Sequence, residues 1–201
     1  MTIAILDYGM GNLRSVGRAL AHVGGDAEIT GDRARVLEAD ALVVPGVGHF
    51  GACMRSLELL GLDTAVRAFA AGGRPIFGVC VGMQILFDRS EEGAERGLGV
   101  LPGVVRRLPS SVKVPHMGWN EVTWIRGHDY IDGIPDGERF YFVHSYAPEV
   151  DVLAVGASEH GQRFAAVVAR SNVFVTQFHP EKSGDAGLHI YERFVKEVAA
   201  A

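Results

Sequence analysis

Cys80 is the residue whose surroundings point most directly to chemistry. It sits at the centre of Gly78-Val79-Cys80-Val81-Gly82, between the apolar run "RPIFGVC" and the helically spaced "VGMQILF". A nucleophile flanked by small residues at a strand-to-helix junction is typical of a nucleophile elbow, because larger side chains would collide across the sharp turn. We expect the sulfur above the carboxyl edge of a sheet, beside a helix N-terminus that favours thiolate. The amide N–H of Val81 would point at any group bound there.

A cysteine nucleophile needs a base and usually a group that orients the base. Among eight histidines, His179 has the best context, because "FVTQFHPEKSG" places it just past the carboxyl end of a β-branched run. Parallel sheets present catalytic groups at that edge. Glu181 could accept the imidazole N–H and fix its tautomer. A plain hydrogen-bonded turn remains the alternative on spacing alone.

The segment "PGVGHFG" (45–51) matches the G-x-G-x-x-G pattern of dinucleotide-binding turns. Such a site carries an acidic residue about 20 positions further on, at the end of the next strand. Here the next strand ends in Cys80 instead. The match to a cofactor turn is therefore coincidental, and the glycines on either side of Val47 would let its peptide rotate with little steric resistance.

The elements that must position these residues indicate an α/β fold. Apolar runs at 2–7, 40–46 and 74–80 alternate with helical periodicity, the first helix carrying Leu13, Val16, Leu20 and Val23 on one face and a second spanning 54–71. This pattern predicts a mostly parallel sheet with helices on both faces. Later strands are predicted at 104–108, 120–125, 139–146, 152–158, 163–170 and 173–180, as an antiparallel or mixed extension of the same sheet. A closing helix and the lack of a linker predict one domain over 1–201.

Composition narrows the function classes. The formal charge is -5 without a basic block, which disfavours nucleic-acid and membrane surfaces. No leader sequence and no 18-residue apolar stretch is present, so we expect a cytoplasmic protein. Cys53 and Cys80 are the two cysteines, and neither fits a disulfide framework or a metal-ligand spacing. We predict no metal and no cofactor.

Taken together, "GVCVGMQ" and "HPEK" are similar to the class I (triad) glutamine amidotransferases, and the resemblance covers the whole chain. It implies the flavodoxin-like fold of that family. Three further stretches, "DYGMGNLRSV", "PGVGHFG" and above all "PHMGWN" (115–120), resemble the glutaminase subunits of imidazole glycerol phosphate synthase, from histidine biosynthesis. Val81 departs from the leucine frequent in the family, but only its backbone N–H is needed.

The resemblance implies hydrolysis of L-glutamine through a cysteine thioester. The catalytic residues would be Cys80, His179 and Glu181, and the oxyanion donors the amides of Val47 and Val81. Glutamine contacts would come from Gly48, Gln84, His144, Ser145 and Tyr146. The ammonia would pass to a (β/α)8-barrel cyclase subunit in a heterodimer, and the interface candidates are Asn12, Trp119 and Lys182.

Three alternatives stay open at this stage. The chain could serve a different ammonia-dependent synthase, although "PHMGWN" is not usual there. It could be a stand-alone cysteine hydrolase of the same topology, active without a partner. The third alternative is a non-enzymatic binding module in which the thiol no longer has a catalytic role, and the intact Cys80, His179 and Glu181 argue against it.

Overall fold

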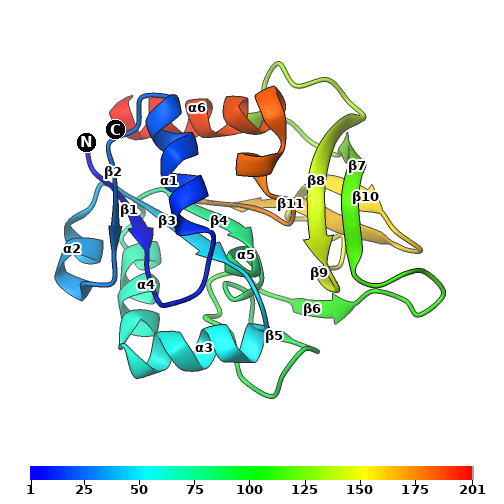
Figure 1. Cartoon of the computed structure of the whole chain (residues 1–201), viewed down its shortest axis with the longest axis horizontal. Helices are drawn as coiled ribbons and strands as arrows, with labels where there is room; N and C mark the ends of the chain where they lie inside the picture. The colour runs from blue at the N-terminus through cyan, green and yellow to red at the C-terminus, as the bar shows by residue number, and fades with distance from the viewer. Residues whose placement is uncertain (201) are drawn as a thin grey trace.

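The computed structural model describes residues 1–200, and within them nine strands form one sheet (Figure 1). Their spatial order is β2 (Ala27–Thr30), β1 (Ile3–Leu6), β3 (Ala41–Gly46), β4 (Ile76–Cys80), β12 (Val173–Thr176), β11 (Arg163–Arg170), β10 (Ala154–Glu159), β7 (His116–Trp124) and β8 (Glu138–His144). No helix in the described residues is long and apolar enough to cross a membrane.

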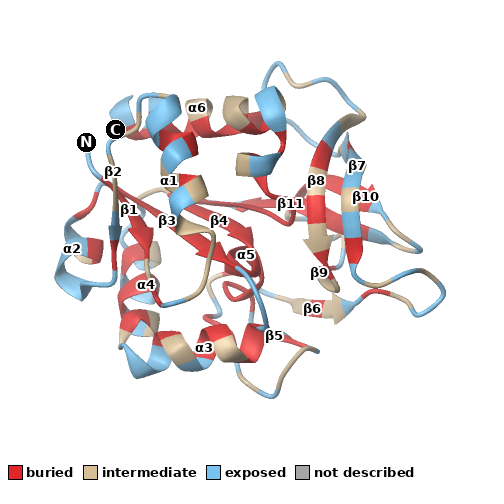
Figure 2. Cartoon of the chain, viewed as in Figure 1, coloured by how far each residue is buried: buried red, intermediate tan, exposed pale blue. Residues whose placement is uncertain are grey.

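The five strands from β2 to β12 are parallel, and the central ones are buried along their whole length (Figure 2). Helices cover both faces, which is why these strands are continuous apolar runs. On one face lie α1 (Leu13–His22) and α6 (Gly184–Ala200), and on the other α2 (Arg33–Glu38), α3 (Phe50–Leu59), α4 (Leu62–Ala71) and the short α5 (Val81–Gln84). The predicted α/β class and the predicted parallel core are confirmed.

The strands from β12 to β8 are antiparallel, as predicted for the second half. One part of that prediction is wrong. The segment 104–108 does not extend the main sheet, because β6 (Val104–Arg107) pairs with β5 (Arg89–Ser90) and β9 (Tyr146–Pro148) in a separate sheet of three strands. The strand predicted over 139–146 is divided at Ser145, since its first part pairs with β7 and its last part with β6.

Several element boundaries also differ from the sequence predictions. The helix predicted over 81–87 ends at Gln84, where the chain tightens into turns with hydrogen bonds three residues back. The strand predicted to residue 180 ends at Thr176, and a 3-10 helix, η2 (Pro180–Lys182), follows. A second, η1 (Asp129–Ile131), precedes β8. Two elements, β2 and α2, were not predicted from the sequence, because both are short and only half of their residues are apolar. Asp32 caps α2 by accepting from Ala34 N at 2.7 Å.

The far edge strand β8 returns to the carboxyl edge of the parallel strands, although four strands separate it from β4 in the sheet order. The amide of His179 donates to Tyr141 O at 2.9 Å, and the rings of Phe140 and Phe178 stack at 4.1 Å. This curl turns an open sheet edge into a two-sided pocket, with β3, β4 and β12 on one side and β8 on the other.

Candidate active site

Cys80 occupies the sharp turn that the sequence predicts. It is a buried non-glycine residue in the left-handed region, with φ of 55°, directly before α5. A Cβ on Gly82 would overlap the carbonyl oxygen of Val44, and one on Gly78 would lie 2.8 Å from Val175 Cγ1. Both glycines are therefore required by close packing around the turn, and the backbone strain at Cys80 is held by its neighbours.

The β3–β4 register places the glycine-rich segment beside the nucleophile, because Gly46 is the partner of Cys80. Gly48 has φ of +95° with open space around it, as a mobile turn requires. Gly46 differs from our expectation, since a Cβ there would lie 2.8 Å from Val81 C, and packing rather than freedom explains the glycine. Val81 begins α5, so its amide has no acceptor within the helix.

His179 and Glu181 form a buried pair, with 2.9 Å between Nδ1 and Oε1. The Pro180 turn of η2 brings the two side chains together. The second nitrogen, Nε2, is buried and has no hydrogen-bond partner among residues 1–200. Asn12 stands at the N-cap of α1, but its side chain does not cap the helix and instead donates to Glu181 Oε1 at 3.5 Å. The contact between His179 and Glu181 is the one expected from the sequence, whereas that of Asn12 with Glu181 was not expected.

The electrostatics of this pair favour a protonated imidazole. Burial lowers the pKa of His179, but Cys80 and Glu181 more than offset it and raise the pKa to about 10. Neighbours that carry or can acquire negative charge stabilise an imidazolium cation. His179 can therefore carry a proton at neutral pH on the side of the nucleophile.

A cavity of about 250 Å³ opens over Cys80, smaller than the roughly 300 Å³ at which sites for drug-sized ligands begin. Its lining contains Cys80, His179 and every predicted oxyanion and substrate residue, namely Val47, Gly48, Val81, Gln84, His144, Ser145 and Tyr146. Three further lining residues were not predicted from the sequence: Glu92, Pro115 and Val143. Glu181 lies behind His179 rather than in the lining. The predicted catalytic, oxyanion and substrate residues other than Glu181 thus line one small pocket.

Sequence reasoning missed two polar residues here, one in the pocket lining and one behind it. Glu92 lines the pocket, and its Oε2 accepts from Phe50 N at 2.7 Å. Gln177, fully buried, faces both Cys80 and Gln84. A loop acid in "SEEG" and a glutamine at the end of a strand carry no spacing that marks a site, so no sequence signal would have found either one.

The opposite wall carries a different histidine arrangement. His144 Nδ1 donates to Tyr146 O at 2.9 Å, which leaves Nε2 to accept from His116 Nδ1 at 3.0 Å. His116 Nε2 in turn accepts from Asn120 Nδ2 at 3.2 Å. Each contact joins one donor and one acceptor only if both rings are neutral. Burial, with a neighbouring histidine as the second cause in each case, lowers the pKa of His116 to about 4 and that of His144 to about 3.

The predicted interface residues surround the outer side of the His179–Glu181 pair. Trp119 is half exposed and meets the Tyr141 ring edge-on at 6.2 Å between centroids. Lys182 Nζ lies 5.7 Å from the centroid of the same ring. With Asn12 on Glu181, these side chains form one surface next to the pocket, which we call the triad-side surface (Asn12, Trp119, Tyr141, Lys182).

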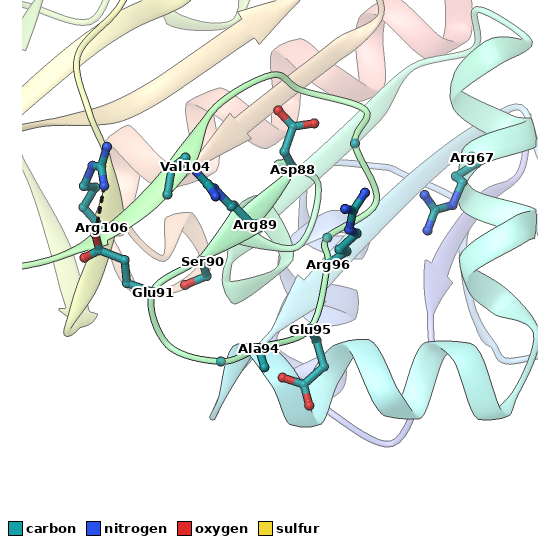
Figure 3. A pocket seen from close by; sticks show the side chains of 13 residues that line it. Arg67, Asp88, Arg89, Ser90, Glu91, Ala94, Glu95, Arg96, Val104 and Arg106 are labelled. Atoms are coloured by element: carbon teal, nitrogen blue, oxygen red, sulfur yellow. Dashed lines mark hydrogen bonds and ion pairs between the residues drawn. The ribbon is translucent and has the colours of Figure 1, made fainter.

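A larger cleft of about 880 Å³ is lined mainly by residues 88–97 (Figure 3). Charged side chains dominate it, among them Arg67, Arg89, Arg96, Asp88 and Glu95. Several of its charges are neutralised in ion pairs, such as that of Arg106 with Glu91 at 2.9 Å. It holds neither the nucleophile nor its base, so the smaller pocket is the candidate active site.

Comparisons with known proteins agree with this geometry. The family model for "Glutamine amidotransferase class-I" matches residues 4–198. Two solved structures share the fold: one described as glutamine amidotransferase, with a TM-score of 0.72 at 24% identity over 99% of both chains, and PurLQS from Thermotoga maritima, with a TM-score of 0.74 at 21% identity over 98% of both chains. The chain belongs to the class I glutamine amidotransferases and is an enzyme of that family.

Its curated relatives are more specific. Imidazole glycerol phosphate synthase subunit HisH from Aromatoleum aromaticum is 50% identical, over 96% of this chain and 97% of the relative. The protein of the same name from Moorella thermoacetica is 47% identical, over 96% and 93%, and that from Bacillus cereus strain ATCC 14579 is 44% identical, over 98% and 96%. The relatives are therefore similar along nearly their whole length, and each is named as a subunit of a larger enzyme.

Proposed function

We propose that this chain is the glutaminase subunit of imidazole glycerol phosphate synthase, which releases ammonia from L-glutamine for histidine biosynthesis. The observation that carries the proposal is the His179–Glu181 pair at 2.9 Å in the same pocket wall as Cys80. The relatives named as synthase subunit HisH support the particular enzyme.

The reaction begins when the Cys80 thiolate attacks the side-chain amide carbon of glutamine. A carbon–sulfur bond forms, and the amide oxygen becomes an oxyanion. The amide of Val81 and that of Val47 are its proposed donors, and both residues line the pocket with Cys80. Removing one such donor typically costs about 10²–10³ in turnover.

Collapse of the intermediate breaks the carbon–nitrogen bond. His179, protonated at neutral pH because its pKa is raised to about 10, gives its proton to the departing ammonia. The neutral imidazole then takes a proton from water, which attacks the thioester and releases glutamate. Glu181 keeps the ring oriented through both steps by its contact with Nδ1.

The pocket polarity suits a zwitterionic amino acid. The carboxylate of Glu92 complements the glutamine α-ammonium, while Gly48 and the backbone at Ser145 and Tyr146 supply polar groups on the opposite side. Gln84 uses its Nε2 on Tyr146 O at 2.8 Å and on Gln177, which leaves its Oε1 to accept from the substrate.

The ammonia is consumed by a (β/α)8-barrel cyclase subunit, bound as a heterodimer against the triad-side surface. Trp119 exposes half of an aromatic side chain there, a feature that protein interfaces favour, and it shares the Tyr141 ring with Lys182. The reaction takes place in the cytoplasm, a reducing compartment that suits the free thiols of Cys53 and Cys80.

The partner also controls turnover in this account. Val47 is 38% exposed at the mouth of the pocket, and Gly48 beside it is free to rotate, whereas Gly46 is packed. The nucleotide-loaded partner stabilises the conformation in which the Val47 amide faces the oxyanion. Equal glutaminase activity with and without partner and nucleotide would contradict this gating.

The direct test is glutamate release by the purified chain mixed with the cyclase and its nucleotide. The Cys80→Ala variant should release none above background, and the matched Cys53→Ala variant should retain activity within about threefold, because Cys53 lies outside the pocket lining. Release that survives Cys80→Ala would overturn the assignment of the nucleophile.

A further inference from the structure

Gln177 contacts both Cys80 and Gln84, and the mechanism above gives it no role. The side chain is fully buried on the segment that leaves β12, two residues before His179. Its Nε2 is 3.8 Å from Cys80 Sγ, and its Oε1 is 3.0 Å from Gln84 Nε2. Either the NH2 group or the oxygen of the Gln177 amide could face the sulfur, and the two orientations have opposite effects on a thiolate.

The neighbours determine that orientation. The carbonyl oxygen of Tyr146 can only accept, so the Gln84 atom 2.8 Å away from it must be the NH2 nitrogen. The same nitrogen also faces Gln177, and there it needs an acceptor, which can only be Oε1. The NH2 group of Gln177 is therefore the end directed at Cys80 Sγ. The reverse orientation would place two NH2 groups against each other.

The sulfur has two hydrogen-bonding neighbours of opposite kind among the described residues. Val143 O lies 3.8 Å from Sγ and can accept from the thiol, but it repels a thiolate. Gln177 Nε2 donates, and a donor to an anion is worth roughly twice a neutral hydrogen bond. Of these two contacts, only that of Gln177 becomes stronger when Cys80 ionises.

We propose that Gln177 is a positioning residue that donates a hydrogen bond to the Cys80 thiolate and is locked in the donating orientation by Gln84 and the Tyr146 carbonyl. This inference rests on the proposed function, in which Cys80 is the attacking atom. Gln177 acts through the sulfur and does not touch glutamine, since it is absent from the pocket lining.

The proposal predicts a change in how readily Cys80 ionises, which iodoacetamide measures directly because only thiolate reacts. In Gln177→Met, which preserves volume but removes the donor, the pH midpoint of Cys80 alkylation should rise by about one unit, and alkylation at pH 7 should slow about tenfold. The kcat for glutamine should fall by a similar factor with KM within about threefold.

The matched control is Thr176→Val. Thr176 precedes Gln177, is equally buried, and loses one hydrogen bond, from Oγ1 to Phe178 O at 3.0 Å, without contact to the sulfur. It should leave the alkylation midpoint unchanged. If Gln177→Met lowers the unfolding temperature as Thr176→Val does but does not move the midpoint, Gln177 is a packing residue and the proposal fails.

Several titratable groups act near Cys80 and must be held constant in this comparison: His179 with Glu181 behind it, His144 on β8, Tyr8 after β1, Cys53 on α3 and Glu92 in the loop after β5. None of them is altered by either variant. Because His179 interacts with Cys80, the alkylation midpoint reports on both groups, and only its difference between variants is interpreted.

If Gln177→Met does not fold, the proposal can still be tested with a second variant and with a measurement on the wild-type chain. Gln177→Glu retains an acceptor for Gln84 but places an oxygen or a carboxylate against the sulfur, and the midpoint should rise further than in Gln177→Met. In the wild type, the NMR resonances of the Gln177 NH2 protons should shift as the pH is raised through the alkylation midpoint of Cys80. Resonances that stay constant over this pH range would contradict the contact.

The alkylation experiment requires neither glutamine nor the partner. A wild-type chain that fails to hydrolyse glutamine with its partner would therefore overturn the proposed function while the effect of Gln177 on the sulfur stays measurable. Conversely, normal glutaminase activity with an unchanged midpoint in Gln177→Met would overturn this inference alone.

Discussion

The two walls of the pocket hold histidine in opposite ways. On the parallel-sheet side, His179 lies between a carboxylate and a thiol, and its pKa is raised to about 10. On the antiparallel side, His144 accepts from another histidine and donates to a carbonyl, and its pKa is lowered to about 3. Both rings are buried, so burial alone does not decide the outcome.

The difference lies in the partners. Cys80 and Glu181 favour a proton on the His179 ring strongly enough to offset burial, whereas His144 has only the Tyr146 carbonyl to favour its proton, against burial and a second imidazole. The parallel-sheet wall therefore supplies a proton for the reaction through His179. On the antiparallel wall, the neutral rings of His116 and His144 hold the backbone at Tyr146 in place by hydrogen bonds. Four predictions test this contrast, beginning with the largest effect.

Replacing His179 by Asn should remove the proton donor while leaving the fold intact. Because general acid–base catalysis contributes about 10²–10⁴, glutamate release with partner and nucleotide should fall about 10³-fold. The corresponding change on the other wall, His144→Asn, should raise KM more than it lowers kcat. If both variants lose kcat equally, the assignment of the proton to one wall is wrong.

Replacing Glu181 by Gln should lower the pKa of His179, because Glu181 is one of the groups that raise it. Activity should fall on the order of 10²-fold. Because the pKa of His179 is higher in the folded state than in the unfolded chain, protonation of this ring adds to the unfolding free energy. That contribution is fully present below the unfolded pKa near 6.5 and is lost as the pH rises to the folded pKa of about 10. The wild type should therefore lose stability across this window in urea titrations.

In Glu181→Gln that alkaline loss should be smaller and should end at a lower pH. The Asp185→Asn variant, which removes a carboxylate from the exposed first turn of α6, serves as the charge-matched control. An alkaline profile unchanged by Glu181→Gln but altered by Asp185→Asn would locate the effect away from the pair.

Replacing His116 by Gln should change acid stability. The pKa of His116 is lowered from 6.5 to about 4, so the unfolded chain binds the proton first and stability falls as pH drops from about 6.5 towards 4. The difference in unfolding free energy between pH 8 and pH 5 should therefore be smaller in His116→Gln. An equal or larger difference would mean that the antiparallel wall is not the acid-sensitive one.

The smallest effect is expected at Cys53, the second buried thiol. Burial, the first of several causes, raises its pKa to about 11, and its Sγ contacts Val47 O at 3.7 Å. Cys53→Ala should cost about 1 kcal/mol of unfolding free energy and little activity. Peptide mapping after brief iodoacetamide treatment at pH 8 should find Cys80 modified and Cys53 intact. Faster labelling of Cys53 would reverse the ranking of the two thiols.

The parallel wall could be predicted from the sequence because its signals are local. Strand, sharp turn and nucleophile are contiguous around Cys80, and His179 and Glu181 are two residues apart. Parallel strands then bring their carboxyl ends to one edge without further information. The strained φ of 55° at Cys80 follows from the same local pattern.

The antiparallel wall could not be predicted in the same way. The return of β8 to the pocket depends on the accumulated curl of strands between β12 and β8, which no short pattern encodes. His116 and His144 are 28 positions apart and meet only because β7 and β8 pair in that register. Glu92 enters the pocket from a loop whose path depends on the separate small sheet.

The central claim is that Cys80 forms a covalent bond to the side-chain carbon of glutamine. The most direct test is to incubate the complex with a diazo-ketone analogue of glutamine and to locate the adduct by mass spectrometry. The account predicts one adduct per chain, on Cys80, absent from Cys80→Ala and slowed in His179→Asn. An adduct on Cys53, or none while glutamine turnover persists, would contradict it.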